Sequence, residues 1–145
     1  MDKSLSQRIA GFLGAINCLL LIPTTLIEIG VLITGLISLV HFEFADLSFC
    51  LLITLIYLVG TTLLYGYYKH QRGETNKTLA IWLWIGTIAF NSIPLFWMLS
   101  NWASYNLIIQ DKTTEFWFYN ILGSYVSAVL LASAALICDS HRDFK

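Results

Sequence analysis

The sequence predicts an all-α integral membrane protein, a four-transmembrane-helix bundle with a kinked or extended first helix and with both termini in the cytoplasm. Hydrophobic residues make up 57% of the 145 residues and charged residues only 12%, and the mean hydropathy of +0.72 lies outside the usual range of soluble domains. Four apolar stretches are long enough to cross a hydrocarbon core of roughly 30 Å. Residues 1–145 are therefore expected to form a single transmembrane domain, with spans at about 23–41, 47–68, 78–100 and 116–138.

The first apolar stretch is longer than one crossing requires. It runs from Ile9 to Phe42, which is roughly 50 Å as a helix. Pro23 lies near its middle, where a proline removes a backbone donor and tends to kink a helix. We expect a span from about residue 23 to 41, and residues 4–21 either lie in the membrane interface or form an N-terminal extension of the first helix.

The other three stretches match single crossings, and the basic residues orient them. Only Lys112 lies on the side of the first and third connections, and the other seven lysines and arginines lie on the opposite side: Lys3, Arg8, Lys69, Arg72, Lys77, Arg142 and Lys145. By the positive-inside rule, that opposite side is cytoplasmic. Aromatic residues are expected to form belts at the two interfaces, with Tyr67, Trp82 and Trp84 in the cytoplasmic belt.

The fourth span carries a stripe of small residues. Ser124, Ala128 and Ala132 recur every four residues, so they share one helical face. Helices in lipid approach closely across such faces. We expect this face to pack inside the bundle or against another copy of the chain.

Glu28 is the embedded ionisable residue that the sequence singles out. A charge at membrane depth costs about 3 kcal/mol or more, so an embedded carboxyl is a functional candidate. Thr24 shares its helical face, and Asn91, midway along the third span, is its expected partner. Tyr57 and Thr61 belong to a hydroxyl stripe on the second span that also includes Thr54, Tyr65 and Tyr68. These groups either lock the bundle through hydrogen bonds or line a wet path.

Four acidic residues flank the outer connections: Glu43, Asp46, Asp111 and Glu115. They are either solvated loop charges or an acidic rim that attracts cations or a basic partner. The 15-residue stretch Asn101 to Glu115 forms the longer outer connection.

Several kinds of chemistry find no support in the sequence. The three cysteines lack the spacing of a zinc or redox site, no catalytic motif or metal set stands out, and a net charge of −1 gives no basic surface for nucleic acid. His70 and His141 fall at cytoplasmic ends, where we expect them to be solvated. We therefore expect no cofactor, no metal and no enzymatic activity.

Three classes of function remain. The preferred one is a small multi-pass protein that acts by assembly, with itself or with a membrane or cytoplasmic protein, as an accessory or regulatory subunit in the bilayer. Bacterial toxin-immunity proteins and membrane components of phage defence are examples of similar size and topology. The compactness of the chain and the absence of sorting signals favour a bacterial inner membrane. The second class is a homo-oligomeric ion or proton conduit that uses Glu28 and Asn91. The third is lipid binding by residues 4–21.

Overall fold

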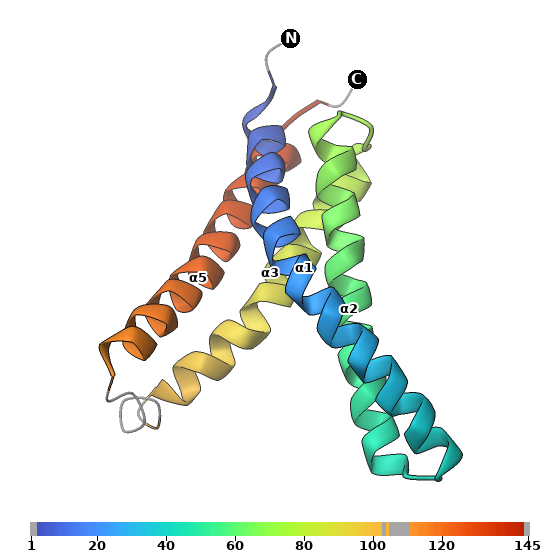
Figure 1. Ribbon diagram of the computed structural model, residues 1–145. Helices are drawn as coiled ribbons and strands as arrows, with labels where there is room; N and C mark the ends of the chain where they lie inside the picture. The colour runs from blue at the N-terminus through green and yellow to red at the C-terminus, as the bar shows by residue number, and fades with distance from the viewer. Residues whose placement is uncertain (1–2, 103, 105–110, 144–145) are drawn as a thin grey trace.

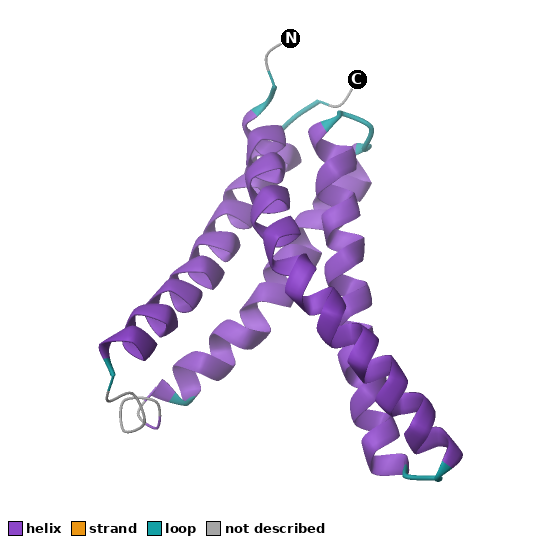
Figure 2. Cartoon of the chain, in the orientation of Figure 1, coloured by secondary structure: helices purple, strands orange, loops and turns teal. Residues whose placement is uncertain are grey.

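The computed structural model describes residues 3–102, 104 and 111–143, and these residues are helical apart from short connections (Figure 2). Four long helices are present among them: α1 (Leu5–Val40), α2 (Phe44–Gln71), α3 (Lys77–Ser100) and α5 (Lys112–Ser140). Each is long and apolar enough to cross a membrane. This confirms the all-helical class and the four candidate spans. Residues 103 and 105–110 of the longer outer connection, and Lys145, lie outside the described part.

α1 is one uninterrupted helix that passes through Pro23, so residues 4–21 continue the first span as helix. The helix begins at a capping box, in which the Ser4 hydroxyl accepts from the Gln7 amide and the Gln7 side chain accepts from the Ser4 amide. Near the proline, Thr24 and Thr25 donate their hydroxyls to carbonyls of the preceding turn. Such bonds help a membrane helix to tolerate an internal proline.

Short connections join the helices in sequence. The α1–α2 turn contains Phe42 at a φ of 57°, and the α2–α3 turn contains Gly73 at a φ of 74°, a left-handed conformation that glycine adopts without steric cost. Asn76 caps α3 by accepting from the Leu79 amide at 2.8 Å. Each turn reverses the chain, so adjacent helices run antiparallel.

The four helices form two hairpins that meet at one end and diverge toward the other (Figure 1). α1 packs mainly on α2, and α3 packs mainly on α5. We call the end where the hairpins meet the closed end; it holds both termini and the α2–α3 turn. The open end holds the α1–α2 turn and the neighbouring ends of α3 and α5.

The hydrophobic core lies at the closed end. Its buried members come from all four helices: Ile9, Ala10, Leu13, Tyr67, Trp84, Ala132 and Ala135. Trp84 and Tyr67 are therefore core residues, and their expected place in the aromatic belt is wrong; Trp82, two residues before Trp84, is exposed. Toward the open end, large apolar side chains such as Leu36, Phe96 and Phe116 are exposed, which suits helices surrounded by lipid tails.

Candidate functional site

A buried polar cluster holds the closed end together, and each helix contributes one residue to it. Asp139 of α5 accepts from the Ser6 hydroxyl of α1 and from the Trp84 indole of α3, both at 2.7 Å. His70 of α2 places Nε2 3.1 Å from Oδ2, the carboxylate oxygen that accepts from Trp84. All four residues are at most 1% exposed. The carboxylate thus accepts two hydrogen bonds and lies beside the His70 imidazole in a buried site, where charge-assisted hydrogen bonds are strong.

The geometry of His70 identifies the role of this cluster. Ser6 and Asp139 both lie at Nε2, at 3.2 and 3.1 Å, whereas Nδ1 lies 2.6 Å from the Thr75 hydroxyl. In a hydrolytic triad the serine and the carboxylate occupy opposite ring nitrogens. These residues instead form a clamp between four helices, because the serine donates its proton directly to the carboxylate.

The sequence analysis missed this clamp, and the expectation that His70 is solvated is wrong. His70 follows Tyr68 and Lys69 at the charged end of α2, and Asp139 follows the apolar run of α5, so both resemble ordinary helix-end charges. One signal was available. A histidine and an aspartate end two spans on the same predicted side of the membrane, at a depth where they can pair.

Glu28 is buried at membrane depth, and only one of its oxygens has a partner. The residue is 5% exposed. Its Oε1 accepts from the Thr54 hydroxyl at 2.6 Å, and its Oε2 has no hydrogen-bond partner within the described residues. Asn91 donates its amide to the Thr87 carbonyl at 2.8 Å, so the expected bond between Glu28 and Asn91 is not formed. Both residues instead line one cavity of about 280 Å³ between the helices.

The hydroxyl stripe of α2 divides into three parts. Thr54 and Tyr57 face α1, where Thr54 bonds Glu28 and Tyr57 lies 2.9 Å from the Thr25 hydroxyl. Thr61 bonds the Leu58 carbonyl of its own helix at 2.9 Å, as Thr24 bonds its own helix in α1. Tyr65 and Tyr68 are exposed near the closed end. The stripe therefore serves the α1–α2 contact rather than one continuous path.

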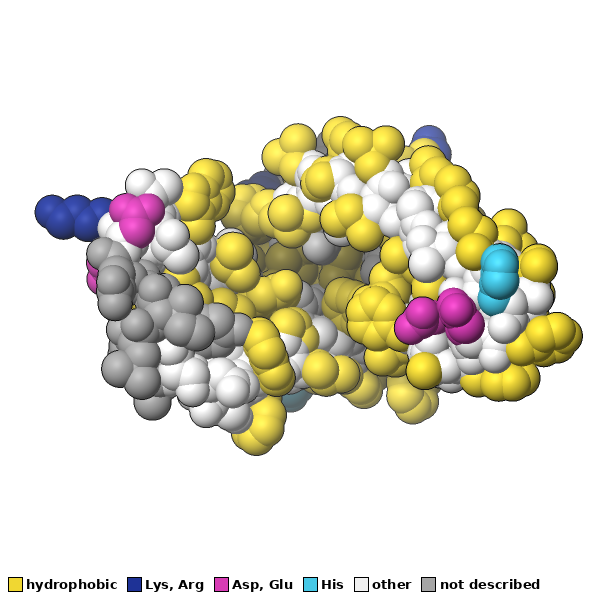
Figure 3. Space-filling view, turned by 60° about the horizontal axis from the view of Figure 1, so that its bottom comes forward, with side chains coloured by type: hydrophobic (Ala, Val, Ile, Leu, Met, Phe, Trp, Pro, Cys, Tyr) yellow, Lys and Arg dark blue, Asp and Glu magenta, His cyan; other side chains and the backbone are white. Residues whose placement is uncertain are grey.

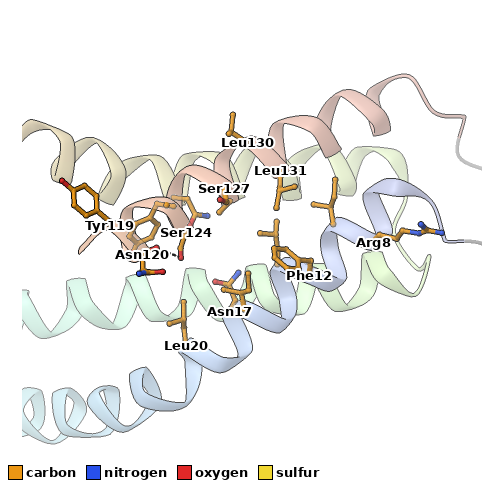
Figure 4. A pocket seen from close by; sticks show the side chains of 17 residues that line it. Arg8, Phe12, Asn17, Leu20, Tyr119, Asn120, Ser124, Ser127, Leu130 and Leu131 are labelled. Carbon is orange, nitrogen blue, oxygen red and sulfur yellow. Dashed lines mark hydrogen bonds between the residues drawn. The ribbon is translucent and has the colours of Figure 1, made fainter. Parts of the chain in front are cut away.

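A larger cleft of about 880 Å³ lies between α1 and α5. Asn17 on α1 and Asn120 and Ser124 on α5 face one another across it (Figure 4). Asn120 and Ser124 bond carbonyls of their own helix. The side chains of Asn17, Tyr125 and Ser127, which also line the cleft, have no hydrogen-bond partner in the described part of the chain. Seen from the open end, the molecule is hollowed between the hairpins (Figure 3).

The small-residue stripe of α5 crosses from the core into this cleft. Ala132 is fully buried in the core, Ala128 packs partly against it and lines the cleft, and Ser124 is exposed in the cleft wall. One part of the stripe thus packs inside the bundle, and the other part remains available to another molecule.

The acidic residues of the outer connections do not form one rim. Glu43 and Asp46 lie at the tip of the α1–α2 hairpin, and Asp111 and Glu115 lie at the start of α5 on the other hairpin. Because the hairpins diverge, the acidic side chains form two separate groups (Figure 3).

Comparison of the chain with protein-family models, with curated proteins and with solved structures gave no match. The cleft, the Glu28 cavity and the clamp therefore have to be interpreted from their own chemistry.

Proposed function

We propose that this chain is a small multi-pass membrane protein that acts by assembly, as an accessory or regulatory subunit, and that a second copy binds in the cleft between α1 and α5. The observation that carries the proposal is the set of polar side chains in this cleft without partners in the described structure, namely Asn17, Tyr125 and Ser127. In hydrocarbon an unsatisfied polar group is costly, since lipid tails offer no hydrogen bond. A partner with polar groups at the same depth removes this cost.

A second copy suits the cleft because its polar groups can pair with themselves. Amides and hydroxyls both donate and accept hydrogen bonds, so two copies related by a two-fold axis can match Asn17, Ser127 and Tyr125 with one another. The small side chains of Ser124 and Ala128 project little from α5, which allows the backbones of two helices to approach closely.

Basic residues orient the assembly. Lys69, Arg72 and Arg142 belong to the closed end, and the positive-inside rule assigns such an end to the cytoplasm. The proposed location is a bacterial inner membrane, where compact subunits of toxin immunity or phage defence offer examples of this mode of action.

Single-cysteine cross-linking in native membranes tests the proposal. The native cysteines Cys18, Cys50 and Cys138 are first replaced by alanine. Ser124→Cys is then compared with Val126→Cys, because both positions are exposed on α5 at similar depth but only Ser124 lines the cleft. We expect a disulfide-linked dimer from Ser124→Cys and only background from Val126→Cys. Equal yields from both, together with a monomeric mass in nanodiscs, would reject the assembly.

A second candidate function, an oligomeric ion or proton conduit, is favoured by one observation. Glu28 and Asn91 line the same cavity, and Glu28 Oε2 has no partner among the described residues. Four helices enclose no wide pore, so a conduit needs several copies with Glu28 toward their shared axis. Proton flux into liposomes that stops on Glu28→Gln would support this function, and wild-type flux no greater than that of empty liposomes would exclude it.

A further inference from the structure

The cavity beside Glu28 has the composition of a site for a charged ligand with an apolar body. Helices α1, α2, α3 and α5 all contribute to its wall. The polar part consists of the Glu28 carboxylate, the amides of Asn17 and Asn91 and the Thr24 hydroxyl. Three aromatic rings also line the cavity: Tyr57, Phe90 and Tyr125. The remaining wall is aliphatic, and no lysine, arginine or histidine is among the lining residues that the structure describes.

The carboxylate identifies the charge of the ligand. Glu28 is almost fully buried, and one of its oxygens lacks a hydrogen-bond partner among the described residues. A buried carboxylate of this kind is stabilised by a cation that also donates a hydrogen bond. Aromatic rings add attraction for a cation over their faces. The two asparagine amides supply carbonyl oxygens that accept from further N–H groups.

The volume and the apolar walls identify the class of cation. Ca²⁺ and Mg²⁺ are held mainly by carboxylate oxygens, whereas Glu28 is the one carboxylate among the described lining residues. A proton alone leaves the roughly 280 Å³ of space empty. That volume approaches the lower limit of pockets for small organic molecules, which are mostly apolar with a few placed polar groups.

The cavity adjoins the larger cleft. Asn17, Leu20, Asn91 and Tyr125 line both spaces, and the larger cleft extends along α1 to Arg8 near the closed end. A ligand thus has a route from the cleft to Glu28 that does not require the hairpins to separate at the clamp.

We propose that this cavity binds a small organic ammonium ion, with its N–H groups on Glu28 and its apolar body among Tyr57, Phe90 and Tyr125. This inference goes beyond assembly and does not depend on it, since the cavity lies within one chain.

Binding of labelled phenethylammonium to the full chain in nanodiscs tests the proposal, with empty nanodiscs as the measure of partition into lipid. We expect saturable binding that is at least about tenfold weaker in Glu28→Gln, and weak binding of the neutral analogue phenethyl alcohol. Glu115→Gln, which removes an exposed acid far from the cavity, is expected to bind like the wild type.

A second variant keeps the test decisive if Glu28→Gln does not fold. A Cβ at Gly60 would lie 3.8 Å from Phe90 Cζ, an ordinary contact, so Gly60→Leu fills the cavity and leaves the carboxylate in place. Gly30→Leu is its control, because a Cβ there meets nothing within 4 Å. We expect Gly60→Leu to abolish binding and Gly30→Leu to retain it. Unchanged binding in Gly60→Leu or Glu28→Gln, or no saturable binding by the wild type, would overturn the proposal. Because a second copy in the cleft would cover the route to Glu28, binding is measured on the monomeric fraction, which separates this result from the outcome for assembly.

Discussion

Two buried carboxylates, Asp139 and Glu28, are surrounded very differently. Asp139 receives hydrogen bonds from Ser6 and Trp84 and lies beside His70, whereas Glu28 receives one from Thr54. A fully bonded buried carboxylate stabilises one packing arrangement, and a partly bonded one remains able to take a ligand. At the scale of single residues, the first group therefore maintains structure and the second is the candidate for function.

Asp139→Asn is expected to destabilise the protein strongly. The amide that replaces one carboxylate oxygen cannot accept, so the Trp84 or Ser6 donor loses its partner in a buried site. Breaking one partner of such a cluster costs about 3 kcal/mol or more. Unfolding in mixed detergent, followed by tryptophan fluorescence, measures the loss. Asp143→Asn, at an exposed position, serves as the control, and an equal stability of the two variants would contradict the clamp.

Thr54→Val is expected to lower stability by about 2 kcal/mol, because it leaves both oxygens of Glu28 without a donor. Thr61→Val is the matched change on the same helix. Among the described residues the Thr61 hydroxyl bonds only its own backbone, so its loss should cost about 0.5 kcal/mol or less. The same detergent titration compares the two, and a larger effect at Thr61 would mean that Thr54 is not the supporting residue.

Sequence patterns located Glu28 but not its partner. The spacing of residues along one helix determines which face they share, and of the predicted stripe Thr54 and Tyr57 both bond side chains of α1. The spacing gives no information on how two helices are rotated against each other, so Asn91 was chosen for its depth alone. For the same reason the burial of His70 and Asp139 could not be predicted, because a charged residue at a helix end is solvated or buried according to what packs on it.

Individual helices were easier to foresee than their contacts. Apolar length predicted each span, and each helix begins one to four residues before its apolar stretch. Capping groups such as Ser4 and Asn76 accept from free amides at these helix starts. In α1, hydroxyls of Thr24 and Thr25 bond carbonyls near Pro23. These bonds help the helix to continue through the proline. At the scale of elements, local sequence therefore determines the helices, and the turns determine how they pair.

The α2–α3 turn depends on one glycine. Gly73→Ala places a side chain at a φ of 74°, which costs about 1 kcal/mol, and should lower stability. Gly30→Ala should do the opposite by about 0.5 kcal/mol, since alanine is favoured in a helix interior and its Cβ would meet nothing within 4 Å. Denaturation of both variants measures whether the free energy of unfolding falls or rises. A stabilising Gly73→Ala would show that the turn does not constrain the junction between the two hairpins.

The whole molecule consists of two hairpins joined at one end. The core and the clamp both lie at the closed end, and the hairpins diverge from there. The four spans could be anticipated from the sequence. The divergence could not, because both packed and lipid-facing surfaces of these helices are apolar, and hydrophobicity does not distinguish them in a bilayer.

Spin-label distances test this shape. A pair at Tyr68 and Ser140 reports on the closed end, and a pair at Val40 and Phe116 reports on the open end; all four positions are exposed. We expect a narrow distance distribution for the first pair and a broader one for the second, because few contacts restrain the open end. Asp139→Asn should broaden the distance distribution of the pair at Tyr68 and Ser140. Equally narrow distributions would show that the hairpins are held along their full length.

The clamp can form only after α5 has been synthesised and inserted into the membrane. Ser6 and Asp139 are separated by 133 positions in the chain, and Asp139 belongs to α5, which leaves the ribosome after α1, α2 and α3. Ser6, His70 and Trp84 must therefore wait in the membrane, as polar groups without their shared acceptor, until α5 is inserted. A nascent chain stalled after three helices cannot complete its closed end, so cellular proteases can distinguish it from a finished molecule.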